Sequence, residues 1–120
     1  VISDRFSDAT VSYQGYGGKV DLAAIRPLDR IATGGLVPDL TILLDIDTVE
    51  GLKRARKKGI DRMEKKDLSY HKRVRAGYLK LSKQYPGRIK RVEVSGQIPE
   101  VQAKIRHEVK IVLRKFERPR

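Results

Sequence analysis

The residues best suited to chemistry stand at the start of the chain. Asp4 and Arg5 follow the apolar pair Val1-Ile2 with only Ser3 between them, an order that predicts a buried strand whose carboxyl end opens onto a ligand crevice. A guanidinium at such a place can hold a phosphate through two parallel hydrogen bonds, which a Lys ammonium cannot do. Taken alone, the two residues also fit a structural ion pair at a strand end.

Three polar side chains follow at helical spacing. Thr10, Tyr13 and Gln14 lie on one face of a helix that we expect over residues 7–14, so that they can converge on one ligand. The glycine-rich residues 15–18 are expected to break this helix. The alternative is a Tyr packed in the core beside two surface polar residues.

A second group of charged side chains lies in the middle of the chain. Its basic members are Lys53, Arg54, Arg56, Lys57, Lys58, Arg62, Lys65 and Lys66. Phosphoryl transfer needs positive charge around the transferring group more than it needs covalent help from the protein. A run of charge is nevertheless ordinarily a solvated helix face, so the stretch alone does not decide its function.

The overall composition limits the classes of partner. The 27 basic and 15 acidic residues give a net charge of +12, which favours anionic partners such as nucleotides or nucleic acid. The absence of Cys excludes disulfides and thiolate metal sites and fits a cytoplasmic protein. No apolar run approaches the roughly 20 residues needed to cross a bilayer, so we expect no membrane partner.

Hydrophobic periodicity predicts strands that alternate with helices. Beyond the opening strand, we expect helices over 21–34, 48–58 and 67–85, strands over 40–45 and 89–94, and a last helix from residue 98. The run over 40–45 predicts a parallel strand covered on both faces. The last helix is expected to bury Val101, Ile105, Val109, Val112 and Phe116. This order indicates an α/β fold with a parallel sheet.

Five motifs in order resemble the bacterial thymidylate kinase family. They are Asp4-Arg5-Phe6 with Tyr13-Gln14-Gly15, the segment 32–40 (ATGGLVPDL), Leu44-Asp45-Ile46-Asp47, Gly51-Leu52-Lys53-Arg54, and Asp61-Arg62-Met63-Glu64. The resemblance runs from Val1 to about Leu113. It implies an enzyme that moves the terminal phosphoryl group of ATP onto dTMP, with Mg²⁺, and a three-layer fold of the P-loop nucleoside monophosphate kinase type.

The resemblance also implies roles for the first motif, over residues 1–18. Arg5 would hold the phosphate of dTMP, and Asp4 would orient Arg5 or hold a water on Mg²⁺. Thr10 and Gln14 would contact the thymine base, and the ring of Tyr13 would lie against the deoxyribose. Phe6 departs from the Tyr or His that the family most often has there.

The donor side of the implied site has two parts. Residues 51–66 match a lid over ATP, in which Arg54, Arg56, Lys58 and Arg62 would contact the phosphates and act in catalysis. Lys58 departs from the Arg of the most similar pattern, and it can supply charge but no bidentate contact. Ser95, Gly96 and Gln97 match the loop over 95–98 that surrounds adenine.

One part that such a kinase needs is not in the sequence. No Gly-x-x-x-x-Gly-Lys-Ser/Thr phosphate loop occurs in the 120 residues. We therefore interpret residues 1–120 as the C-terminal part of a single kinase domain whose N-terminal strands and phosphate loop belong to a missing N-terminal part or to a complementing chain. The chain alone is expected to be inactive, and the complete protein to be a homodimer.

Two other functions are considered beside this one. The first is a small basic nucleic-acid-binding domain, but the chain has few aromatic residues among its charges, so nucleic acid is not the expected partner. The second is a related nucleoside monophosphate kinase of another specificity.

Overall fold

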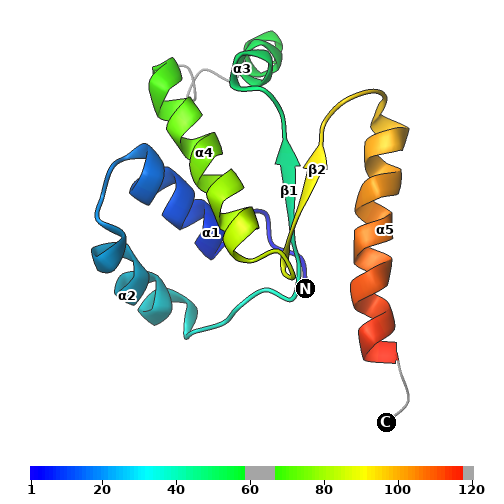
Figure 1. Cartoon of the computed structure of the whole chain (residues 1–120), viewed down its shortest axis with the longest axis horizontal. Helices are drawn as coiled ribbons and strands as arrows, with labels where there is room; N and C mark the ends of the chain where they lie inside the picture. The colour runs from blue at the N-terminus through cyan, green and yellow to red at the C-terminus, as the bar shows by residue number, and fades with distance from the viewer. Residues whose placement is uncertain (59–66, 118–120) are drawn as a thin grey trace.

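A small parallel sheet lies at the centre of the fold. The computed structural model describes residues 1–58 and 67–117. Strand β1 (Thr41–Asp45) pairs in parallel with β2 (Ile89–Glu93), with Thr41 opposite Ile89 and Asp45 opposite Glu93 (Figure 1). Parallel neighbours need a long crossover connection. Here it contains α3 (Thr48–Lys57) and α4 (Leu68–Gln84).

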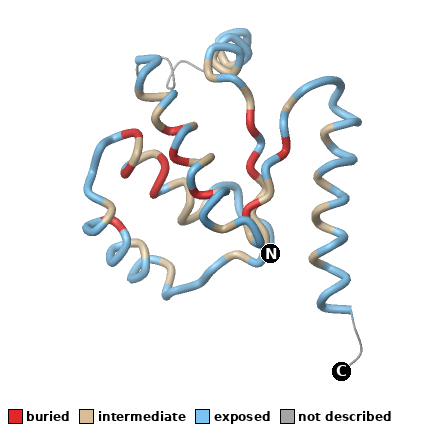
Figure 2. The backbone as a smooth tube through the Cα atoms, viewed as in Figure 1, coloured by how far each residue is buried: buried red, intermediate tan, exposed pale blue. Residues whose placement is uncertain are grey.

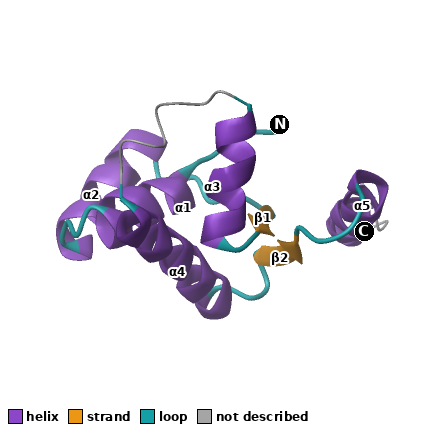
Figure 3. Cartoon of the chain, turned by 90° about the horizontal axis from the view of Figure 1, so that it is seen from above, coloured by secondary structure: helices purple, strands orange, loops and turns teal. Residues whose placement is uncertain are grey.

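Helices cover both sides of this sheet. On one side lie α1 (Ser7–Thr10), the π-helix η1 (Val11–Gly17), α2 (Leu22–Thr33) and α4. The other side holds α5 (Ile98–Glu117), which stands alone there when the molecule is seen from above (Figure 3). The predicted α/β fold with three layers and a parallel sheet is therefore confirmed.

Local sequence signals define the helix ends. The carboxylates of Asp21, Asp47 and Asp67 accept backbone N–H groups of the first turns of α2, α3 and α4, so all three are N-caps. Gly34 ends α2 in a left-handed conformation, with φ of 64°. These capping residues define where each helix begins or ends, as the sequence predicts for Asp21, Gly34 and Asp67.

The hydrophobic core lies between the sheet and the helices on one side of it. Figure 2 shows the buried residues within η1, α2, α4 and the two strands and none in α5. The buried apolar side chains are Val11, Ile25, Leu43, Val74, Leu81, Ile89 and Val92. The first helices and α4 therefore form one packed unit with the sheet.

The predicted opening strand is wrong. Residues 1–5 form no strand, and Val1 and Ile2 are fully exposed. Within the described residues β1 is hydrogen-bonded along the edge facing β2 only, so the first residues have no strand to pair with. The predicted coverage of β1 on both faces is wrong as well, because Leu44 keeps 52% of its surface exposed.

The first helix ends inside the glycine cluster, as expected, but at Gly17 instead of the predicted residue 14. The helix continues through Gly15 and Gly17 as the π-helix η1. A Cβ at Gly17 would lie 2.6 Å from Val74 Cγ2. Glycine is used here because it lets η1 approach α4 closely.

The last helix packs less than its sequence predicts. Val101, Ile105, Val109 and Val112 are half-buried, and Phe116 is 69% exposed, so none of the five residues is buried as expected. Periodicity identifies the apolar face of a helix but not what covers that face. Over the ranges that the structure describes, no helix has the length and apolar character needed to cross a membrane.

Candidate nucleotide site

The side chain of Arg5 lies over the ring of Tyr13. The guanidinium carbon is 5.0 Å from the ring centroid, a distance typical of a cation–π contact. Arg5 has a φ of 67°, which is uncommon for a residue other than Gly, and its carbonyl oxygen accepts a hydrogen bond of 2.9 Å from Ser3 Oγ. The structure thus brings together two of the residues predicted for the acceptor nucleotide.

Tyr13 packs against α4. The ring of Tyr78 meets it edge to face, with 6.1 Å between the two centroids, and Tyr70 Oη donates a hydrogen bond of 3.4 Å to the Tyr13 carbonyl oxygen. Burial raises the pKa of Tyr78 to about 12. The Tyr78 hydroxyl is therefore neutral at physiological pH. The edge-to-face contact between Tyr13 and Tyr78 is set by packing.

A shallow cavity lies between the first residues and α2. Its volume is about 330 Å³, and it is lined by Arg5, Phe6, Ser7, Ala9, Thr10, Asp29, Ala32 and Thr33. Arg5 and Thr10 therefore face the same cavity. Tyr13 and Gln14 are not part of this lining; Gln14 is exposed on η1, and Tyr13 is half-buried against Tyr78.

In the part of the chain that the structure describes, Asp4 makes no contact with the Arg5 side chain that would orient it. Asp4 is exposed, and among the described residues no hydrogen bond or ion pair joins it to Arg5. The ion pair that holds this segment is instead made by Asp8, a residue that the sequence does not single out. Asp4 is left accessible to a ligand.

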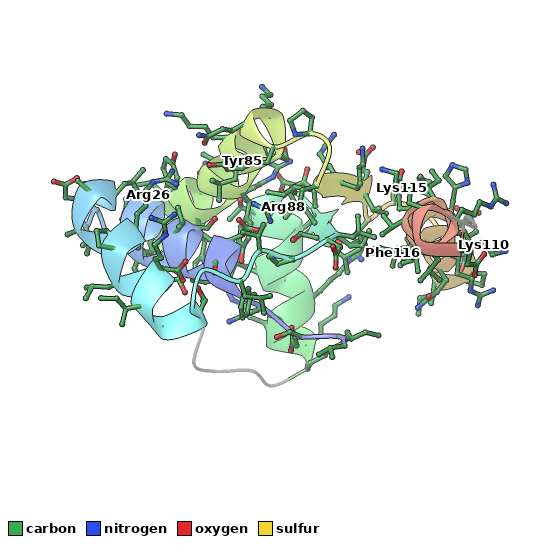
Figure 4. All side chains as sticks on the ribbon, turned by 90° about the horizontal axis from the view of Figure 1, so that it is seen from below. Arg26, Tyr85, Arg88, Lys110, Lys115 and Phe116 are labelled. Carbon is green, nitrogen blue, oxygen red and sulfur yellow. The ribbon has the colours of Figure 1, made fainter. Side chains whose placement is uncertain are left out.

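Asp8 links α1 to the start of both strands through hydrogen bonds. Arg88 donates to the two oxygens of the Asp8 carboxylate at 2.7 and 3.1 Å, and Thr41 Oγ1 donates to Oδ2 at 3.3 Å. Arg88 also stacks on Tyr85, with its guanidinium carbon 5.1 Å from the ring centroid (Figure 4). The hydrogen bonds to the Asp8 carboxylate raise the pKa of Arg88, so its guanidinium stays charged. Because 80 residues separate these partners, no local pattern predicts the contact.

The predicted lid residues fall partly on α3. Arg54 Nε lies 3.2 Å from Glu50 Oε1, one turn earlier on the same helix, and both side chains are about half exposed. Arg56 is also exposed on α3, and Lys58 is the exposed residue at its end. Arg62 lies outside the described residues. The basic face of α3 is thus open to solvent, as a surface that meets phosphates must be.

The predicted adenine loop follows β2. Ser95, Gly96 and Gln97 are exposed, and Gly96 has a φ of 79°. This positive φ favours Gly, and the Glu100 carboxylate lies in the space where a Cβ of Gly96 would stand. Figure 1 shows this loop and α3 at the same end of the sheet, where the strands end. Ligands of open α/β sheets bind at that end.

Comparison with known proteins identifies the family. Residues 1–105 match the family model described as thymidylate kinase. The chain belongs to the thymidylate kinase family. It is 43% identical over 116 residues to a thymidylate kinase of Nostoc punctiforme, covering 95% of the chain and 55% of that protein. A thymidylate kinase of Gloeobacter violaceus is 45% identical over 116 residues, with 94% and 55% covered.

A solved structure supports the same family. The crystal structure of a thymidylate kinase from Ehrlichia chaffeensis aligns with a TM-score of 0.65 and 26% sequence identity, over 89% of this chain and 48% of that one. The chain thus spans about half the length of the thymidylate kinases it matches. The nucleic-acid-binding alternative finds no support in these comparisons.

Proposed function

We propose that the protein carrying this chain is an ATP-dependent thymidylate kinase. A phosphate oxygen of dTMP forms a bond to the γ-phosphorus of ATP while the bond to the β–γ bridging oxygen breaks, which gives dTDP and ADP. The observation that carries the proposal is the match of residues 1–105 to the family, which includes Arg5 stacked on Tyr13.

The acceptor side of the site is assigned to the first motif. Arg5 binds the phosphate of dTMP, since its planar guanidinium can offer two parallel donors. Thr10 and Gln14 are exposed and can donate and accept hydrogen bonds, so they contact the thymine base. Tyr13, fixed between Arg5 and Tyr78, lies against the deoxyribose. An added 2'-hydroxyl is rejected there by packing, which typically discriminates about a hundredfold.

The donor side is assigned to the end of the sheet where the strands end. Arg54, Arg56 and Lys58 of the α3 segment contact the phosphates of ATP, with Arg62 as a fourth candidate. The exposed loop containing Ser95, Gly96 and Gln97 lies along adenine.

Mg²⁺ is the implied metal ion. No group of three potential ligands is found in the part of the chain that the structure describes, so no all-protein cage is present there. Mg²⁺ usually keeps several of its waters and takes one or two carboxylates together with substrate phosphates. The exposed Asp4 carboxylate fits such a role, through a bound water. When bound, the ion neutralises charge on the phosphates.

The proposed partners follow the same assignment. The protein binds dTMP and ATP, forms a homodimer in the cytoplasm, and takes its phosphate loop from the remaining half of the protein or from a complementing chain. Light scattering of the intact protein tests the dimer.

The decisive experiment is an ADP-release assay on the intact protein. With ATP and Mg²⁺, we expect turnover with dTMP well above that with dUMP, dCMP, AMP or GMP. The 120 residues alone should release no ADP because they contain no phosphate loop. Turnover that favours another monophosphate would assign the protein to a related kinase. Salt-dependent DNA binding without any turnover would overturn the proposal.

A further inference from the structure

A buried carboxylate lies where β1 ends, outside the predicted site. Asp45 is 4% exposed, and two arginines from different elements hold it. Arg75 of α4 donates through Nε at 2.9 Å and through Nη2 at 3.2 Å, and Arg91 of β2 donates through Nε at 2.7 Å. Both carboxylate oxygens are therefore bonded, which offsets the cost of burying the charge.

The two arginines differ in what else they reach. Arg75 Nη1 lies 4.0 Å from Oδ1 of Asp47, whereas Arg91 makes its ion pair and its hydrogen bond with Asp45. Asp47 is the N-cap of α3, and its Oδ2 accepts the backbone N–H groups of Val49 and Glu50 at 3.1 and 3.2 Å. Arg75 thus joins the end of β1 to the start of α3.

This joint matters because α3 is only partly packed. No residue of α3 is fully buried; Leu52 and Ala55 are half-buried, and the helix contacts α4. Its exposed arginines, Arg54 and Arg56, can meet phosphates reproducibly only if the start of the helix is fixed. Small displacements of positioned groups cost large factors in rate.

We propose that Arg75 is a positioning residue that clamps the start of α3 to the end of β1 and thereby places Arg54 and Arg56. The catalytic consequence rests on the proposed function, in which α3 carries the donor-phosphate arginines. The mechanical part, a link between Asp45, Arg75 and Asp47, does not depend on it.

Arg91 provides the matched control. Arg75→Gln and Arg91→Gln each remove one arginine from Asp45, but only Arg75→Gln removes the link to Asp47. In the intact protein, amide hydrogen exchange over residues 48–57 should speed up by about fivefold in Arg75→Gln, the size expected for loss of a partly exposed ion pair, and stay at the wild-type rate in Arg91→Gln. Equal exchange in both variants would overturn the proposal.

Kinetics test the consequence separately. Arg75→Gln should lower kcat and kcat/KM together by about fivefold, because an interaction needed in the transition state is weakened, while Arg91→Gln keeps both values. Arg75→Lys should recover part of the loss, since it keeps the charge without the fork. A rise in KM with kcat unchanged would overturn the positioning role.

A milder variant guards against misfolding. Asp47→Asn retains a good N-cap and removes the charge that faces both Arg75 and the first turn of α3. It should reproduce the faster exchange over residues 48–57, and wild-type exchange would overturn the clamp. If the exchange results hold but the wild-type protein phosphorylates no dTMP, the clamp stands and the proposed function fails.

Discussion

The guanidinium of Arg5 rests on the ring of Tyr13, with 5.0 Å between the guanidinium carbon and the ring centroid. The contact spans the junction between the irregular first residues and the helical segment formed by α1 and η1. Tyr13 is itself backed by Tyr78 of α4, so the position of Arg5 depends on the packing of α4. Arg5, near the start of the chain, is thus placed by a helix that begins only at Leu68.

Replacing Arg5 tests its role as the acceptor-phosphate ligand. Arg5→Ala should lower kcat/KM for dTMP by about a hundredfold, the size seen when one preorganised donor is removed from a reacting group. Arg5→Lys should lose about tenfold, because charge remains without the bidentate fork. Arg26→Ala, on the exposed face of α2, is the charge-matched control and should keep the wild-type value (Figure 4).

The pair of Asp8 and Arg88 should contribute to stability. Asp8→Ala leaves Arg88 unpaired in a site where the side chains are only 13% and 19% exposed. We expect the free energy of unfolding to fall by about 2 to 3 kcal/mol, near the lower end for breaking a buried pair. Urea denaturation measures it, with the exposed Asp39→Ala as control. Equal losses in the two variants would contradict this prediction.

Asp45 should make the stability of the protein depend on pH. Burial raises its pKa, but the hydrogen bonds from Arg75 and Arg91 outweigh burial, and the pKa is lowered overall. A lowered pKa stabilises the folded state above the unfolded-chain value of about 3.9, and this stabilisation is lost as pH falls through the folded value.

The variant Asp45→Asn isolates this effect from the other carboxylates. The difference in free energy of unfolding between wild type and variant should be constant from about pH 7 to about pH 5. It should shrink below about pH 4, where Asp45 of the unfolded wild-type chain is protonated, and should vanish once Asp45 of the folded protein is protonated as well. Urea titrations at each pH measure it. A difference that persists unchanged at about pH 2 would show that the charge of Asp45 is not stabilising.

A buried hydroxyl in η1 offers a stabilising change. Ser12 is 0% exposed, and its Oγ has no hydrogen-bond partner among the described residues. Ser12→Ala should therefore raise the free energy of unfolding by about 1 kcal/mol. Ser82 Oγ donates to the Leu79 carbonyl oxygen at 2.7 Å, so Ser82→Ala should lower it by about 1 kcal/mol. Thermal unfolding of both variants would refute this if Ser12→Ala were the less stable.

The sequence predicts the parts of the fold that depend on local signals. The N-caps Asp21 and Asp67 and each of the strands over 41–45 and 89–93 follow from residues that are close in the chain. The wrong predictions concern which neighbouring elements cover a strand or helix. The run over 40–45 looks like a strand covered on both faces, yet Leu44 is exposed, because hydropathy records the character of a face and not its neighbour.

The candidate site divides in the same way. The motif that contains Arg5 and Tyr13 is visible in the sequence, and the structure brings these two side chains together. The residues that support them are not visible, because Tyr78 reads only as the apolar face of a helix. Asp45 and Arg75 are 30 residues apart and belong to no common motif. Such tertiary ion pairs need coordinates to be found.

The pairing of β1 has a consequence for handling the protein. Its ladder hydrogen bonds run to β2 alone within the described residues, and the apolar side chain of Leu44 is exposed. A strand edge with unpaired N–H and C=O groups is a template for strands of other molecules. Concentrated solutions of the 120-residue chain should therefore self-associate through β1, and Leu44→Lys, which places a charge on that strand, should raise its solubility.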